Sequence, residues 1–145
     1  MNFRPADKSD WPLLAQWNHR MIRDQRHRNP MNPAQLKRRM AKWLREKEYQ
    51  ALLFEQNQGP VGYVLFRKER DHIHVRQFFI DRPYRRKGLG QRAMKLLLTR
   101  VWPRKSRVVL EVLIHNRRAI RFWRSLGFKD YALTLEKGPL RSVAT

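Results

Sequence analysis

The stretch Ile80-Asp81-Arg82-Pro83-Tyr84-Arg85-Arg86-Lys87-Gly88-Leu89-Gly90 carries the most structural information in this chain. A strand-like run at 72–80 leads into it, and an amphipathic helix is predicted from about residue 88. A loop between a strand and a helix leaves backbone N–H groups unpaired at the positive end of the helix. The two glycines let an anion approach the backbone closely, and residues 85–87 add three positive charges. The segment therefore predicts a phosphate-binding loop.

Two widespread phosphate-binding loops are excluded by the residues that follow. A Walker A loop requires Gly-Lys and then Ser or Thr, whereas Gly90 is followed by Gln91-Arg92. A dinucleotide-binding fingerprint requires a third glycine and a place in a first βαβ unit, and this loop has neither. What remains is another class of phosphate site, or a basic turn that is closed by glycines.

Helices and strands are predicted on both sides of the loop. Before it, in chain order, come a strand at 2–4, a helix capped by Ser9 or Asp10, a polar loop at 24–32, and a helix capped by Asn32 with Pro33 and Gln35 in its first turn. A hairpin of 49–56 with 61–67 and the strand at 72–80 follow. After the loop come the helix from 88, a strand at 107–114, a helix capped by Asn116 and closed by Gly127, and a strand at 128–136. This order, βααβββαβαβ, predicts an α/β fold with a mixed central sheet of about six strands and four helices. At 145 residues the chain has the length of one domain, so residues 1–145 are expected to form a single unit.

The composition excludes several kinds of site. Without cysteine the chain cannot hold a disulfide, an iron–sulfur cluster or a thiolate zinc site, and it has no cysteine nucleophile. His72 and His74 have same-face spacing on their strand, but no third ligand accompanies them, so no metal site is predicted. No apolar run is long enough to span a membrane, and the N-terminus lacks the apolar core of a signal peptide. We therefore expect a cytoplasmic protein without membrane contact.

The charge of the chain is strongly positive. Lys and Arg number 33 against 12 Asp and Glu, which gives a net charge of +21. Such a field attracts phosphorylated ligands, nucleic acid or acidic surfaces. The cations are spread over every predicted element instead of following one stripe, which disfavours a dedicated nucleic-acid surface.

Two blocks of the chain resemble one enzyme superfamily. The segment Arg85-Arg86-Lys87-Gly88-Leu89-Gly90, which follows a strand, resembles the acetyl-CoA pyrophosphate loop of the GNAT superfamily of N-acetyltransferases. Residues 110–128, LEVLIHNRRAIRFWRSLGF, look like the second hallmark block of that superfamily: a strand, an Asn-capped helix with a central Ala, and a closing Gly-Phe. The blocks have the family's order and are separated by one helix, and the resemblance covers essentially the whole chain. It implies the GNAT fold and acetyl transfer from acetyl-CoA to a primary amine of a small molecule or a protein N-terminus.

The resemblance also implies which residues hold acetyl-CoA. The end of the strand would pair its backbone with the pantetheine arm, and one backbone N–H would polarise the thioester carbonyl. The loop would cradle the pyrophosphate, and the residue that caps the next helix would contact the arm, unless it serves as a cap alone. The implied residues are Phe78, Phe79, Ile80, Arg85, Arg86, Lys87, Gly88, Leu89, Gly90, Gln91 and Asn116.

The base and the acid of the reaction are assigned in the same way. Glu111 stands where ribosomal-protein alanine N-acetyltransferases of this superfamily carry their general base. It interrupts an apolar strand, so burial would favour its neutral form, which suits a base working near neutrality. The alternatives are an edge glutamate paired with a cation, and His74 as the base. Trp123 stands where most members have a tyrosine as the acid, so the thiolate leaves unassisted, or Tyr131 or a water protonates it.

The acceptor site and the partners are less defined. The polar residues of the 24–32 loop, which overhangs the acceptor site in this fold, and one polar residue of the 72–80 strand are substrate candidates: Asp24, His27, Arg28, Asn29 and Gln77. The positive charge favours an anionic small molecule or an acidic peptide over polyamines. The alternative function is a basic GNAT-fold protein with little turnover that binds nucleic acid or the ribosome. The chain is expected to be a monomer or a homodimer.

Overall fold

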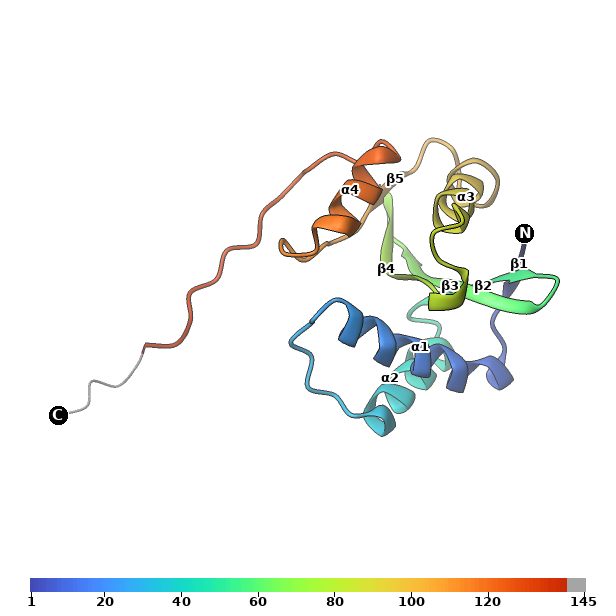
Figure 1. The fold of residues 1–145 in the computed structure, drawn as a ribbon, viewed down its shortest axis with the longest axis horizontal. Coiled ribbons are helices and arrows are strands. Elements are labelled where there is room, and N and C mark those ends of the chain that lie inside the picture. The colour runs from blue at the N-terminus through green and yellow to red at the C-terminus, as the bar shows by residue number, and fades with distance from the viewer. Residues whose placement is uncertain (141–145) are drawn as a thin grey trace.

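A computed structural model describes residues 1–140 of the chain, in which a mixed five-stranded sheet lies between two layers of helices (Figure 1). The strands are β1 (Asn2–Pro5), β2 (Gln50–Gln56), β3 (Gly59–Lys68), β4 (His72–Ile80) and β5 (Arg107–Val109), and the helices are α1 (Trp11–Asp24), α2 (Pro33–Arg45), α3 (Leu89–Leu96) and α4 (Arg117–Ser125). The strand order is β1-β2-β3-β4-β5. The strands β1 to β4 are antiparallel to one another in sequence, and β5 is parallel to β4. The predicted α/β architecture is confirmed.

One face of the sheet is covered by α1 and α2. Trp17 of α1 stacks on Tyr63 of β3 at 5.9 Å between ring centroids and packs on Phe79 of β4 at 5.7 Å. All three side chains are buried, as are Leu36 and Met40 of α2. These contacts fix the first half of the chain on β3 and β4.

The other face is covered by α3 and, less tightly, by α4. The apolar stripe of α3 is buried at Leu89 and Ala93 against the far side of the sheet. Helix α4 has no fully buried residue; Phe122 and Trp123 are partly buried over Phe78 of β4, with ring centroids 6.0 and 5.4 Å away. Helix α4 is therefore attached to the sheet more loosely than α3 is.

The predicted helix ends are confirmed at α2 and α4 and corrected at α1. Asn32 and Gln35 form a reciprocal capping box at the start of α2, with both hydrogen bonds at 2.8 Å. The side chain of Asn116 accepts a hydrogen bond from the N–H of Ala119, which opens α4. Asp10 occupies the N-cap position of α1 but makes no side-chain cap bond there, because its carboxylate accepts from the N–H of Asp7. Ser9 lies in the short 3₁₀ turn, capped by Asp7, that precedes α1.

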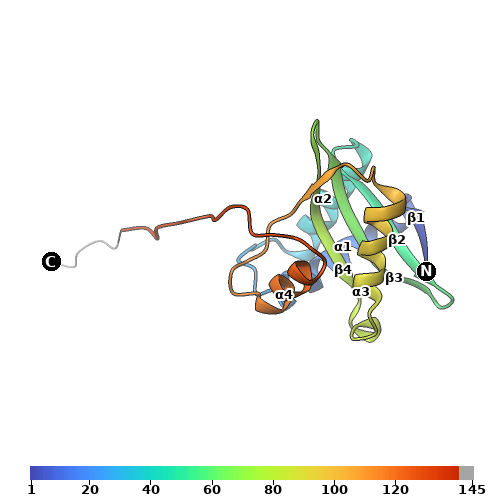
Figure 2. The same ribbon diagram turned by 90° about the horizontal axis from the view of Figure 1, so that it is seen from above.

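Two strand predictions are wrong. The strand predicted at 107–114 is paired only at Arg107–Val109, and no strand forms over 128–136, so the sheet has five strands instead of about six. Residues 129–140 are exposed and run away from the domain in two perpendicular views (Figures 1 and 2). Strand propensity is expressed only beside a partner strand, and no strand within residues 1–140 pairs with this segment.

The expectation of one unit over residues 1–145 extends beyond this description, since residues 141–145 lie outside the described part of the chain. None of the helices within residues 1–140 has the length and apolar character that a membrane span requires.

Candidate active site

The strands β4 and β5 separate after a short paired region. Their parallel pairing comprises His72 with Arg107, Ile73 with Val108, and His74 with Val109. Beyond His74, β4 continues to Ile80, while the segment after Val109 leaves the sheet. Within the described residues, this edge of β4 over 75–80 has no strand partner. An extended ligand can therefore pair with the exposed backbone groups there.

A β-bulge lies at the point where the strands separate. Leu65 of β3 faces Gln77 of β4, but the next residue, Phe66, faces Val75, so Arg76 has no partner in β3. The extra residue changes which side chains point to each face of the sheet. Val75 and Phe78 both pack on the α3 side, whereas Phe79 packs on the α1 side. The bulge disrupts the local ladder beside the unpaired edge of β4.

The two candidate bases form one hydrogen-bonded pair next to this opening. Nε2 of His74 lies 2.8 Å from Oε2 and 3.1 Å from Oε1 of Glu111. The His74 side chain is 16% exposed and that of Glu111 is 74% exposed. The burial that the sequence predicted for Glu111 is therefore wrong, because strand pairing ends at Val109 and the residue faces solvent. The pair combines a partly enclosed imidazole with an accessible carboxylate.

The glycine loop has the conformation that an anion site requires. Gly88 has φ of +73° and precedes the first turn of α3. The N–H groups of residues 86–91 have no hydrogen-bond acceptor within residues 1–140. The first helical bond that enters this turn is donated by Arg92 to the carbonyl of Gly88, at 3.0 Å. The loop therefore presents consecutive donors at the positive end of a helix.

The second glycine of the loop has a packing role as well. A Cβ at Gly90 would lie 3.3 Å from the Phe122 ring of α4 and 3.7 Å from Ile80 of β4. The absence of a side chain therefore lets α3, α4 and the end of β4 meet closely. This contact holds α4 beside the opening between the two strands.

The cations around the loop divide into two groups. Arg85 donates through Nε to the carbonyl of Ile80 at 2.7 Å and through its terminal nitrogen to Asp24 at 2.9 Å, and Arg82 also reaches Asp24, at 3.2 Å. These bonds tie the loop to the end of α1. Arg86 and Lys87 are exposed and have no acidic partner within the described residues. Arg86 and Lys87 are thus the cations that remain for a ligand, whereas Arg85 holds the loop in place.

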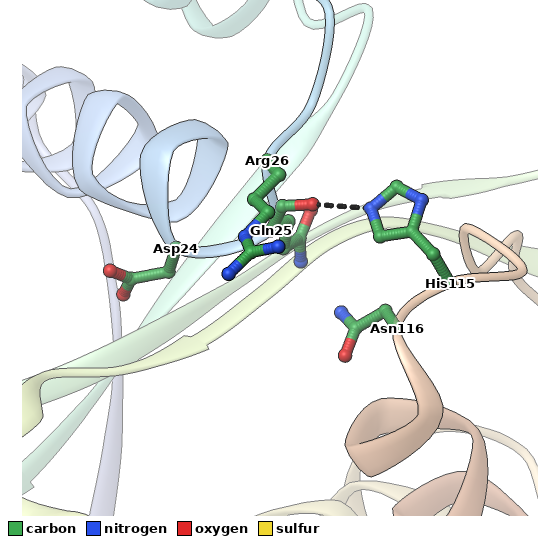
Figure 3. A pocket seen from close by; sticks show the side chains of 5 residues that line it. All are labelled: Asp24, Gln25, Arg26, His115 and Asn116. Carbon is green, nitrogen blue, oxygen red and sulfur yellow. Dashed lines mark hydrogen bonds between the residues drawn. The ribbon is translucent and has the colours of Figure 1, made fainter.

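A pocket of about 300 Å³ lies between the end of α1 and the start of α4 (Figure 3). It is lined by Asp24, Gln25, Arg26, His115 and Asn116. Nε2 of His115 lies 2.8 Å from the backbone carbonyl of Gln25, which bridges the two sides. Sequence reasoning missed His115 and Gln25, and no local pattern marks a contact across 90 residues. Asn116, predicted for the cofactor, lines this pocket while it caps α4.

The remaining substrate candidates have partners of their own. Gln77 is buried, and its amide oxygen accepts a 2.6 Å hydrogen bond from the hydroxyl of Tyr63, whose pKa is raised by burial. In the 24–32 loop, His27 accepts from the N–H of Asn29, and Asn29 accepts from the N–H of Met31. Arg28 forms an exposed ion pair with Glu136 at 2.9 Å. Of the five candidates, Asp24 alone lines the pocket.

The two aromatic residues considered for the acid lie in different surroundings. Trp123 packs on Phe78, Phe122 and Phe128, with ring centroids 4.9–5.4 Å apart. Tyr131 is 88% exposed on the extended segment that leaves the domain. The described chain therefore does not bring Tyr131 to the His74–Glu111 pair.

A family model described as the Acetyltransferase (GNAT) family matches residues 11–128. The chain belongs to this family. It is therefore an acyltransferase of the GNAT fold, and the family uses acetyl-CoA. The match includes the glycine loop, the separated strands and the His74–Glu111 pair.

Solved structures share the GNAT fold. A possible acetyltransferase from Clostridium difficile 630 superposes with a TM-score of 0.77 at 15% identity, with 97% of each chain covered. An acetyltransferase from Thermus thermophilus gives 0.72 at 21% identity, covering 88% of this chain and 86% of that one. A predicted acetyltransferase from Clostridium acetobutylicum, solved with acetyl-CoA, gives 0.69 at 17% identity, covering 94% and 95%. No curated protein matches this chain in sequence.

The residues present fit acetyl-CoA as the GNAT co-substrate. The N–H groups of residues 86–91 suit a pyrophosphate, and Arg86 and Lys87 add charge beside them. The unpaired edge of β4 over 75–80 suits an extended arm with amide groups.

Proposed function

We propose that the protein is an N-acetyltransferase, which moves the acetyl group of acetyl-CoA directly to a primary amine at the His74–Glu111 pair. The observation that carries this proposal is the position of the pair. Pairing of β4 with β5 ends at His74 and Val109, and Glu111 follows two residues later. A proton acceptor therefore stands where the strand edge becomes available to the arm of the co-substrate.

Acetyl-CoA supplies an activated acetyl thioester, and the chain supplies its binding and orientation. The donors of residues 86–91 hold the pyrophosphate, with Arg86, Lys87 and Gln91 at the rim. The backbone of Phe78, Phe79 and Ile80 pairs with the arm, and an N–H beside the bulge polarises the thioester carbonyl. Phe79 contributes through its backbone only, because its side chain is buried toward α1.

Glu111 removes the proton that the acceptor ammonium must lose. Its carboxylate is accessible, and Nε2 of His74 holds both of its oxygens within 3.1 Å. This contact fixes the orientation of the carboxylate and lets the imidazole share the proton that is gained. A positioned base of this kind contributes about 10²–10⁴-fold to the rate.

The leaving thiolate departs without a side-chain acid from the described chain. The indole of Trp123 cannot donate a proton at useful pH, and its contacts are those of a packing residue. A thiol with a pKa of about 8–9 is a good leaving group near neutral pH, so water suffices as the proton source.

The acceptor is a primary amine of a small molecule or of a protein N-terminus. The net charge of +21 disfavours polycationic acceptors and favours amines that carry carboxylates or belong to acidic peptides. The pocket beside Asn116 and Asp24 lies between the end of α1 and the start of α4 and offers polar groups to such a molecule.

The proposal is tested by replacing the members of the pair in turn. With a panel of amines and thiol release as the readout, we expect Glu111→Gln to lower turnover by about 10²–10⁴-fold and His74→Gln by a smaller factor. Acetyl-CoA should still raise the melting temperature of both variants, because neither residue belongs to the glycine loop. Glu46→Gln, at an exposed position after α2, is the matched control and should keep the wild-type rate.

Two results would overturn the proposal. One is a near-wild-type rate in both Glu111→Gln and His74→Gln. The other is wild-type protein that shows no thermal shift with acetyl-CoA but binds RNA in a salt-sensitive way, which would favour the nucleic-acid alternative.

A further inference from the structure

Two arginines from different elements lie against one buried aromatic ring. The guanidinium carbon of Arg39 in α2 is 4.3 Å from the ring centroid of Trp43, and that of Arg76 in β4 is 5.1 Å from the same centroid. Trp43 is 8% exposed, Arg39 is partly buried and Arg76 is exposed. The face of an aromatic ring attracts each cation, but the two contacts also bring two positive charges together.

No carboxylate of the described chain neutralises these two charges. Within residues 1–140, neither Arg39 nor Arg76 has an acidic oxygen within 4.0 Å. Nε of Arg39 is buried without a hydrogen-bond partner there, and a terminal nitrogen donates to Asn18 at 3.1 Å. Burial lowers the pKa of Arg39, and the charge of Arg76 lowers it further. Two like charges that are partly removed from water and lack a counter-ion favour the binding of an anion beside them.

The β-bulge lets Arg76 and its neighbour face the same side of the sheet. Arg76 is the residue without a partner in β3, and it contacts Trp43 of α2. The next residue, Gln77, also faces the α1 and α2 side, where it bonds to Tyr63. A strand without a bulge would point two consecutive side chains to opposite faces. The bulge therefore gives this face both the cation and the buried amide.

The same face carries His74 of the proposed catalytic pair. His74 is the partner of Arg67 in β3, and opposite partners in neighbouring strands point to the same side. The guanidinium carbon of Arg67 lies 5.0 Å from the ring centroid of Tyr49, and this ring packs edge-on against Trp43 at 5.0 Å between centroids. Contacts on one face therefore connect His74 to the ring on which the two arginines lie.

The separation between the catalytic pair and the arginines limits which molecule can reach both. Residues two apart in a strand have Cα atoms roughly 7 Å apart. Arg76 extends from β4 toward α2, whereas Glu111 lies on the β5 side of His74. A free α-amino acid is too short, because a single carbon separates its ammonium from its carboxylate. A carboxylate on a longer tether, such as the side chain of the second residue of a peptide, can span the gap.

We propose that Arg39 and Arg76 bind a carboxylate of the acceptor while its amine lies at the His74–Glu111 pair, so both arginines determine specificity. This inference rests on the proposed N-acetyltransferase function. A guanidinium binds a carboxylate through two parallel N–H donors, and contact with the Trp43 ring restricts the orientation of those donors. The acceptor class is a primary amine with a distant carboxylate, supplied either by an acidic peptide N-terminus or by a small ω-amino acid.

Equilibrium binding tests the site without requiring turnover. Isothermal titration calorimetry of the full chain, saturated with CoA, compares Ala-Glu-Ala amide with Ala-Gln-Ala amide, which differ by one negative charge. We expect the acidic peptide to bind about 10–100-fold more tightly, and Arg39→Gln and Arg76→Gln each to remove most of that preference. The pair ε-aminocaproate and hexylamine makes the same comparison for a small molecule. The pair that shows the preference identifies the source of the carboxylate.

Matched variants separate a local site from a general effect of charge. Arg38→Gln removes the same charge from an exposed position of α2, and Arg70→Gln removes it from the exposed turn between β3 and β4, so both should keep the preference. Arg76→Glu should reverse it, so that Ala-Lys-Ala amide binds more tightly than Ala-Glu-Ala amide. If Arg39→Gln does not fold, Arg76→Gln carries the test, because Arg76 is exposed.

Two results would overturn the inference. One is wild-type protein that binds both members of each pair equally, and the other is a preference that Arg38→Gln removes as fully as Arg76→Gln does. An acetylation assay with the same peptides reports on the proposed function separately. Acetylation of both peptides with equal KM would leave acetyl transfer standing and exclude the carboxylate site. A charge preference in binding without acetylation of either peptide would contradict acetyl transfer and support the anion site.

Discussion

At the residue scale, two left-handed backbone conformations, at Arg86 and Gly88, shape the anion site of the loop. Gly88 adopts φ of +73°, and the N–H groups of residues 86–91 are left without acceptors in the described chain. No atom lies within 4 Å of the position that a Cβ would take at Gly88, so its constraint is conformational and not steric. Gly90 differs, because a side chain there would meet Phe122 at 3.3 Å.

Gly88 therefore allows a clean test of the loop. Gly88→Asn tolerates the left-handed conformation, and Gly88→Asp has the same shape with one negative charge added. We expect the asparagine variant to keep most of the rise in melting temperature that acetyl-CoA produces, and the aspartate variant to lose it by repulsion of the phosphates. Scanning fluorimetry with and without acetyl-CoA measures both, and an undiminished shift in Gly88→Asp would exclude the loop as the phosphate site.

The sequence predicts several residues of the candidate site but not the contacts between them. His74 and Glu111 were each recognised as candidate bases, yet they are 37 positions apart. The parallel register of β4 and β5 brings them together, and no local pattern encodes that register. For the same reason Glu111 was predicted to be buried: its apolar neighbours indicate a strand, but they do not show that pairing ends at Val109.

At the element scale, α4 lies beside the opening between β4 and β5 and is held there by a shallow contact. It touches the sheet through Phe122 and Trp123 on Phe78, and it has no fully buried residue. Its ends are well determined by Asn116 and by the closing turn at Gly127. A helix with fixed ends and a shallow apolar contact can adjust to what lies between it and β4.

Trp123 should therefore act through packing and not through chemistry. Trp123→Phe removes part of a partly buried ring, so we expect a loss of about 1–2 kcal/mol in the free energy of unfolding. Acetyl transfer should remain within a few-fold of the wild-type rate. Denaturant unfolding and steady-state thiol release measure the two quantities, and a folded but inactive Trp123→Phe variant would show that the indole takes part in the reaction.

Helices were predicted more accurately than strands, and the reason lies in where each signal resides. Asn32 and Gln35 form a capping box, and Asn116 caps α4. Each of these caps involves residues no more than three positions apart, so it needs no distant partner. The strands expected at 107–114 and 128–136 have suitable residues, but their extent depends on a neighbouring strand. The first is paired over three residues, and the second is unpaired within the described chain.

At the scale of the whole molecule, charge is distributed very unevenly between the two signs. Ten of the 12 acidic residues lie within 4.0 Å of a basic side chain: Asp7, Asp10, Asp24, Glu55, Glu69, Asp71, Asp81, Glu111, Asp130 and Glu136. Only a minority of the 33 Lys and Arg side chains are engaged in these pairs within residues 1–140. The surface therefore has a large surplus of unneutralised cations, which favours anionic ligands over cationic ones.

The separation of β4 from β5 also bears on how the protein resists proteases. Residues 104–128 are joined to the rest of the domain by three residue pairs of β5, by partly buried aromatic contacts of α4, and by the side chains of Arg107, Glu111 and His115. None of these contacts is deeply buried, so we expect this part to open while the remainder stays folded. Trypsin cleaves after Lys and Arg, and every helix contains such residues. The place of the first cuts in the folded body therefore depends on which part of the domain opens and not on where cleavable residues lie. Apart from the exposed 129–140 segment, we expect the first cuts to fall within 104–124 and acetyl-CoA to delay them, as followed by mass spectrometry. First cuts in α2, which is equally rich in cations, would contradict this. A co-substrate that fills the opening would then govern the lifetime of the protein as well as its chemistry.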